Sequence, residues 1–291
     1  MKFKIYHNIA MLKAFKNLLI KFGTAIAIPI GQFKWRDEMT MRTLALLMGL
    51  GLVAVFGGPA WATPSATFWT PCTTYLQPAG VPHITYDSYF NRAADYPTDV
   101  GLTIGLLPGE KVQAEAGFDL FLPGEFPWQF NFKAGVPEDA LFKYSPGINA
   151  GIFGMGFVPD VNNYNVIHAT VGHAIPKVGS LAAGFYQGTT RDLLESSDGE
   201  DQSRGYMAAY YRTLEPWTER LAITADYMSG KNLYGGGGVG LYLWPSRSVD
   251  VILGWVWFND GELNPYPNGL FTIQLDVDLD FQRHLEKAGS P

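Results

Sequence analysis

The sequence predicts an all-β fold, an up-and-down antiparallel transmembrane β-barrel of about twelve strands with both termini in the periplasm. Three observations support this prediction. The first is composition: charged residues make up 16% of the chain, aromatic residues make up 14%, and there are 33 glycines. This composition disfavours helices and suits strands joined by tight turns. The second is alternation of apolar and polar residues, and the third is a regular difference in the lengths of the connections.

Alternation is clearest in the last predicted strand, residues 269–281. Leu275 and Val277 share one face, and Asp276, Asp278 and Asp280 share the other, because side chains alternate along a strand. A slip of one residue would turn the aspartates towards hydrocarbon. The same reasoning gives twelve predicted strands: 83–90, 99–107, 110–121, 127–136, 146–158, 163–175, 179–190, 204–214, 219–229, 235–244, 248–258 and 269–281.

Connection lengths separate a membrane barrel from a soluble sandwich. Numbered from the N-terminus, most odd connections are long and most even ones are short, with two exceptions. Bacterial membrane barrels show this asymmetry, with long external loops and short periplasmic turns. A secreted soluble β-sandwich, which stays an alternative, has no reason to alternate loop length.

The N-terminal residues predict an export signal. Arg42 precedes an apolar run from Leu44 to Phe56, and Ala60-Trp61-Ala62 follows as a small-x-small cleavage site. We therefore expect residues 39–62 to be a signal peptide and residues 1–38 an upstream extension or a long n-region. Residues 63–82 are expected to form a periplasmic N-terminal segment, residues 83–281 the barrel, and residues 282–291 a C-terminal tail.

The signal peptide and the alternating last strand, which ends at Phe281, resemble those of Gram-negative outer-membrane β-barrel proteins of the porin-like class. The resemblance covers residues 63–281, and this chain continues for ten residues beyond Phe281. It implies an outer-membrane location and a C-terminal signal that the barrel-assembly machinery reads.

Residues that could carry chemistry are few. The net charge of −6 argues against nucleic acid as a partner. His168 and His173 lie five positions apart on one predicted strand, so they face opposite sides and cannot share a metal. Cys72 is the single cysteine, and we expect it to be a small buried side chain. The run Gly235–Gly238 predicts a flexible loop or a bend in the barrel wall. We expect no enzyme activity, cofactor or metal.

The predicted strand directions define which residues face the lumen and which lie at the membrane interfaces. The predicted lumen-lining residues are Lys111, Glu115, Asp119, Gln129, Asn131, Lys133, His168, Arg212, Arg220, Asp226, Asp250, Gln274, Asp276, Asp278 and Asp280. The predicted interfacial aromatic residues are Trp128, Tyr164, Tyr227, Trp244, Trp257 and Phe281, because amphipathic rings favour the membrane–water boundary.

This polar inner face predicts a passive channel for small polar solutes with a weak preference for cations, since acidic residues outnumber basic ones. The alternative is a closed barrel, in which opposite charges fill the lumen and the external loops bind lipid or protein. The expected partners are outer-membrane lipid and lipopolysaccharide, and the barrel-assembly machinery during biogenesis.

Overall fold

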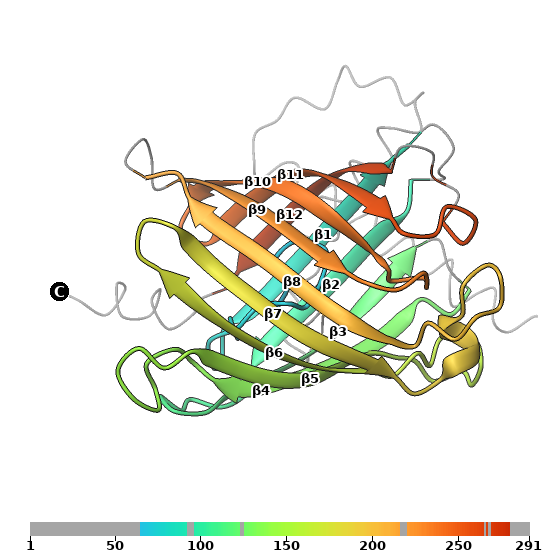
Figure 1. Cartoon of the computed structure of the whole chain (residues 1–291). Coiled ribbons are helices and arrows are strands. Elements are labelled where there is room, and N and C mark those ends of the chain that lie inside the picture. Colours follow the sequence, from blue (N-terminus) through green and yellow to red (C-terminus); the bar gives the residue numbers. More distant parts are fainter. Residues whose placement is uncertain are drawn as a thin grey trace, which may run out of the picture. The chain divides into compact units, whose positions relative to one another are not determined.

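The computed structural model describes residues 65–91, 96–122, 125–215, 220–264, 266 and 269–279. Within these residues, twelve antiparallel strands form one closed barrel, in which each strand pairs with its neighbours in sequence and β1 pairs with β12 (Figure 1). The predicted all-β, up-and-down antiparallel barrel of about twelve strands is confirmed. No helix among the described residues is long and apolar enough to cross a membrane.

The strands follow the predicted segments closely. They are β1 (Pro82–Phe90), β2 (Thr98–Gly105), β3 (Gln113–Leu122), β4 (Trp128–Val136), β5 (Gly147–Met155), β6 (Val166–Ile175), β7 (Gly179–Gly188), β8 (Arg204–Thr213), β9 (Leu221–Met228), β10 (Gly236–Ser246), β11 (Val249–Phe258) and β12 (Leu270–Asp278). A short 3₁₀ helix, Arg191–Leu194, lies between β7 and β8.

The two ends of the barrel differ. At one end, which we call the turn end, β1 begins, β12 ends, and short turns such as residues 176–178 and 247–248 join neighbouring strands. At the other, the loop end, lie longer connections, among them residues 156–165, residues 189–203 and the connection between β11 and β12, whereas the turn end has one connection of ten residues, 137–146. An even number of antiparallel strands brings the start of β1 and the end of β12 to the same end.

The seam between β1 and β12 fixes the face of the last strand. Asp276 is paired with Thr85, and Gln274 with Asp87. Asp276 and Asp278 line the barrel cavity, whereas Phe271 and Ile273 are exposed on the outside. Because side chains alternate, Leu275 and Val277 share the outer face with them. The predicted orientation of this strand is therefore the one observed.

The outer wall carries many exposed apolar side chains. Phe185 is 75% exposed, and further examples on the wall are Tyr206, Ile167, Val239, Leu181 and Leu253. The inner wall instead carries buried polar residues, among them Thr103, Asn149, Thr170, Thr224 and Thr272. A soluble fold would place these two faces the other way round.

Several predictions concern residues outside the described part of the chain. These are the upstream extension (1–38), the signal peptide (39–62), the C-terminal tail (282–291), and the positions of Asp280 and Phe281.

Candidate functional site: the barrel interior

The barrel interior holds a segment of the chain itself. Residues 65–81, which we call the inserted segment, precede β1 and lie inside the wall, where they bond to side chains of β3, β4, β5, β9, β10 and β12. Residues 63–82 were predicted to form a periplasmic N-terminal segment that precedes the barrel. From Ser65 onward this expectation about its position was wrong.

Asp226 of β9 anchors the middle of the inserted segment. Its Oδ2 atom accepts hydrogen bonds from the backbone N–H groups of Phe68 (3.0 Å), Trp69 (2.9 Å) and Thr70 (2.7 Å). The Thr70 hydroxyl donates a fourth, at 3.0 Å. Successive N–H groups converging on one carboxylate oxygen form an anion-binding nest, which stabilises the buried charge.

Glu115 of β3 holds both ends of the inserted segment. Its carboxylate accepts hydrogen bonds from the N–H of Ser65 (2.7 Å), the hydroxyl of Ser65 (2.8 Å) and the N–H of Gln77 (2.6 Å). Lys133 of β4 lies 3.2 Å from Glu115 and donates to the carbonyl of Ser65 at 2.7 Å. Both charged side chains are fully buried, so loss of either one would leave the other charge uncompensated inside the barrel.

Glycines of the wall make room for the ring of Phe68. A Cβ atom on Gly238, Gly240 or Gly254 would collide with that ring. Gly238 belongs to the Gly235–Gly238 run, which the sequence analysis interpreted as a loop or a bend. Here it lets an aromatic side chain lie directly against the wall backbone. Phe68 is 5% exposed and packs in a cluster with Tyr89, Ile252, Val256 and Leu270.

Cys72 lies in the same segment and is fully buried. It packs in a second apolar cluster with Phe153, Val166, Met207 and Met228. Burial, with the nearby charge of Asp226 as a smaller cause, raises the pKa of the Cys72 thiol to about 12. The thiol is therefore protonated and unreactive while the segment is in place, in keeping with the predicted buried side chain.

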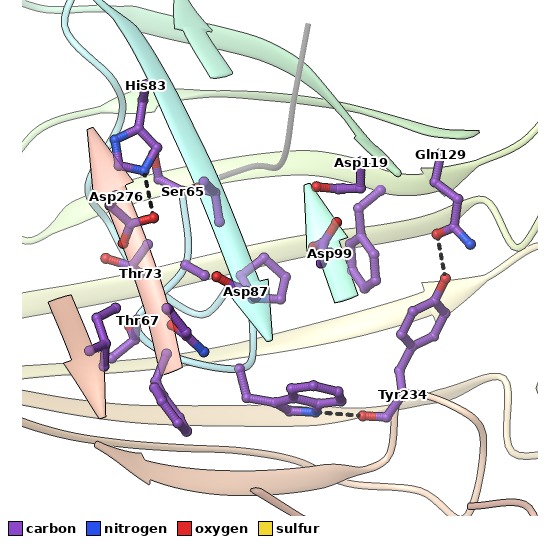
Figure 2. A pocket seen from close by; sticks show the side chains of 18 of the residues that line it. Ser65, Thr67, Thr73, His83, Asp87, Asp99, Asp119, Gln129, Tyr234 and Asp276 are labelled. Carbon is purple, nitrogen blue, oxygen red and sulfur yellow. Dashed lines mark hydrogen bonds and ion pairs between the residues drawn. The ribbon is translucent and has the colours of Figure 1, made fainter. Parts of the chain in front are cut away.

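A cavity of about 1360 Å³ remains beside the inserted segment. Its lining includes residues from the turn end, such as Asp278 and Ser180, and residues from the loop end, such as Phe126 and Asn162. The cavity therefore extends along the barrel, with the inserted segment forming part of its lining (Figure 2).

Most of the predicted lumen-lining residues lie inside the wall. The cavity is lined by Asp119, Gln129, Asp250, Gln274, Asp276 and Asp278, and the buried inward set also includes Glu115, Asn131, Lys133, His168 and Asp226. Inward acids that the sequence analysis missed are Asp87 of β1 and Asp99 of β2, both of which line the cavity. Asp99 is the first residue of its predicted strand, and Asp87 lies in the first predicted strand, where Ser88 interrupts the apolar face.

Three predicted basic residues do not face the lumen. Lys111 and Arg220 are exposed in turns, because β3 and β9 begin later than predicted, at Gln113 and Leu221. Arg212 is exposed on the outer face of β8, paired with Ile223, which is itself 39% exposed. That strand has apolar residues on both faces, so its pattern did not fix the orientation.

The barrel interior holds fewer basic side chains than predicted. Of the Lys and Arg side chains in the described strands, Lys133 faces inward and is neutralised by Glu115. Arg204, like Arg212, is exposed, and it lies opposite the exposed Gln187 in the strand register. His83 lies 3.0 Å from Asp278 and 3.6 Å from Asp276. The interior is therefore more strongly acidic than the sequence analysis expected.

Two predicted interfacial aromatic residues also face inward. Trp244 lines the cavity and stacks on Tyr242, with ring centroids 5.5 Å apart. Tyr164 lies in the loop before β6, lines the cavity, and contacts Tyr234 edge to face at 5.2 Å. By contrast, Trp128 and Trp257 are 45% and 37% exposed on the outer wall, and Tyr227 contacts the exposed Tyr206 there.

The described residues contain no group of three or more His, Cys, Asp or Glu side chains arranged to hold a metal ion. His168 is buried against Phe153, with ring centroids 5.8 Å apart. His173 pairs instead with Glu138, at 3.0 Å.

No family model and no curated protein matches this sequence. Among solved structures, the chain is similar to the outer membrane phospholipase A from Escherichia coli (12% identity, TM-score 0.41, covering 70% of this chain and 93% of that one). It is also similar to the NanC porin (8%, 0.43, 68% and 99%) and to an outer membrane channel from Pseudomonas putida F1 (10%, 0.38, 77% and 97%). Matches at these identities and TM-scores carry no argument about activity or substrate.

Proposed function

We propose that this chain is an outer-membrane β-barrel that passes small polar solutes, cations preferentially, along the cavity beside its inserted segment. The role is transport without catalysis. The location is supported by the apolar outer wall, which would suit lipid, and by the closed barrel, which leaves no strand edge unpaired.

One observation carries the proposal: a single cavity has lining residues from both ends of the barrel, and its charged lining is mainly acidic. Acidic linings attract cations and repel anions. The inserted segment narrows the path, so we expect a conductance well below that of an open barrel of the same strand number.

Planar-bilayer recording of the purified barrel in potassium chloride tests this. We expect small, cation-selective conductance, with a reversal potential displaced towards that of potassium in a salt gradient. Folding is checked by the heat-sensitive mobility of the barrel on a gel. If the native chain and the Asp226→Ala variant both fold into a barrel and neither gives a current, the proposal is overturned.

The second candidate is a closed barrel whose inserted segment seals the lumen. It is favoured by the tight fixation of that segment at Asp226 and Glu115. A native chain that is silent, together with an Asp226→Ala variant that conducts, would establish this candidate and overturn the first.

A further inference from the structure

The cavity contains a patch of carboxylates with aromatic side chains on both sides. We propose that this patch binds a small organic primary ammonium ion, with Asp87 and Asp99 accepting hydrogen bonds from the ammonium and the aromatic rings contacting its apolar body. The inference deepens the proposed function and rests on it for the solute class, since the site lies on the proposed path.

The carboxylates come from three adjacent strands. Asp87 of β1 and Asp99 of β2 are directly opposed in the strand register, which puts their Cα atoms about 4.5–5.5 Å apart. Asp119 of β3 lies in the same part of the cavity, and Figure 2 shows the three side chains grouped there. Like charges this close are destabilising unless a positive partner offsets them.

Two of these carboxylates have unused acceptor atoms. Asp87 is 8% exposed and Asp99 is 6% exposed, and the Oδ1 atom of each has no hydrogen-bond partner. Buried charges are normally paired or bonded, so these atoms point to a missing donor. Neither side chain takes part in the ion pairs found among the described residues.

An independent observation comes from Gln274 of β12, which is not a carboxylate. It is paired in register with Asp87, lines the cavity and is 3% exposed, yet its Nε2 atom has no partner. Rotation of the side-chain amide exchanges its oxygen and nitrogen, so Gln274 can present either an acceptor or a donor to a ligand.

One aromatic arm begins at Tyr89, whose hydroxyl donates to Asp87 at 3.2 Å. Tyr89 contacts Trp69 of the inserted segment edge to face at 5.9 Å, and Trp69 contacts Phe258 at 5.6 Å. Phe258 in turn contacts Tyr266, with centroids 5.8 Å apart. All four rings line the cavity.

The second arm begins at Gln129, which is paired in register with Asp119. Its Oε1 atom accepts a hydrogen bond from the hydroxyl of Tyr234 at 3.0 Å, and Tyr234 contacts Tyr164 and Phe153. The indole N–H of Trp69 donates to the carbonyl of Tyr234 at 3.4 Å, which joins the two arms (Figure 2).

Aromatic rings near carboxylates favour an organic ammonium over a bare metal ion. Aromatic rings attract a cation through their quadrupole and also pack against apolar groups. A primary ammonium has three N–H donors for the unused oxygens of Asp87 and Asp99, and its carbon skeleton can contact the rings. Metal ions such as calcium require six to eight oxygen ligands, and rings supply none.

Titration calorimetry on the intact barrel in detergent tests the site. The probe is benzylammonium, with benzyl alcohol as a neutral partner of the same shape. We expect benzylammonium to bind and benzyl alcohol to bind at least tenfold more weakly. Asp99→Asn and Asp87→Asn should each weaken benzylammonium binding by roughly ten- to a hundredfold, because each removes a charge-assisted hydrogen bond.

Asp250→Asn is the matched control, since it removes one inward carboxylate from the turn-end part of the cavity and should change benzylammonium binding less than threefold. Equal binding of the amine and the alcohol, equal effects of all three substitutions, or no binding to a folded barrel overturns the proposal. Calcium binding that excludes benzylammonium also overturns it. If benzylammonium binds to a barrel that does not conduct, the binding site stands and the channel is refuted. If the barrel conducts but does not bind benzylammonium, the channel stands and the binding site is refuted.

Discussion

Replacing Asp226 by alanine should release the inserted segment from the barrel interior. The substitution removes the acceptor of four hydrogen bonds, three of them from consecutive backbone N–H groups. Bonds to a charged acceptor contribute about 1.5–3 kcal/mol each and are not additive, so we expect a loss of about 3–5 kcal/mol of docking free energy. The ratio of docked to released segment should fall by roughly a hundred- to several-thousandfold.

Cys72 reports this release directly, because it is the single cysteine of the chain and is fully buried in the segment. With a pKa of about 12, roughly one thiol in ten thousand is ionised at pH 8, against about one in four for a free cysteine. Labelling by a maleimide should therefore accelerate by up to about a thousandfold in Asp226→Ala, alongside a rise in bilayer conductance.

Asp226→Asn serves as the control, because the amide retains one oxygen acceptor without the charge, and an intermediate labelling rate is expected. Slow labelling and native conductance in a folded Asp226→Ala barrel would refute the assignment of Asp226 as the anchor.

Three further predictions follow from other contacts. Leu275→Arg, which places a charge on the outer face, should cost about 2–4 kcal/mol near the membrane midplane and reduce the folded fraction on a gel. Asp276→Asn should leave assembly intact and shift the reversal potential; equal assembly defects would contradict the assigned faces. Lys133→Met should destabilise the barrel by about 3–5 kcal/mol in urea unfolding, because it leaves Glu115 buried without its cation. Adding Glu115→Gln should recover part of this loss, and no recovery would show that the pair is not coupled. Asp260 accepts hydrogen bonds from the N–H (3.0 Å) and hydroxyl (2.8 Å) of Ser197, and the bond from that N–H is the largest cause holding the pKa of Asp260 at about 2. This pKa lies below its unfolded value near 3.9. The hydrogen bonds between the Asp260 carboxylate and Ser197 are therefore present above pH 4 and are lost as the pH falls through 2. The protection factor of the Ser197 amide, its exchange rate relative to an unstructured peptide at the same pH, should therefore fall between pH 4 and pH 2 in the native chain and show no such step in Asp260→Asn.

The strand pattern was predictable where one face is apolar and the other polar. In β12 and β3 a period of two decided which residues face inward, and the structure agrees for Asp276 and Glu115. In β8 both faces carry apolar residues, so Arg212 was assigned to the wrong side. Strand ends were less predictable, and two basic residues were therefore placed in the lumen rather than in turns.

The inserted segment could not be predicted from local pattern. It has no periodicity, and its anchor Asp226 lies 156 positions after Thr70 in the sequence. One signal was present: the four glycines from Gly235 to Gly238 open a predicted strand, but the pattern did not show that Gly238 makes room for the ring of Phe68. The acidic patch was missed in part because Asp99 is the first residue of its predicted strand and Ser88 interrupts the apolar face of the strand that carries Asp87.

Because Glu115 bonds to both Ser65 and Gln77, the described part of the inserted segment forms a loop whose two ends meet at one side chain of the wall. The segment can therefore be withdrawn while every hydrogen bond between the strands of the wall stays intact. Opening and unfolding are separate events in such an architecture, so the stability of the wall and the ease of opening can change independently in evolution.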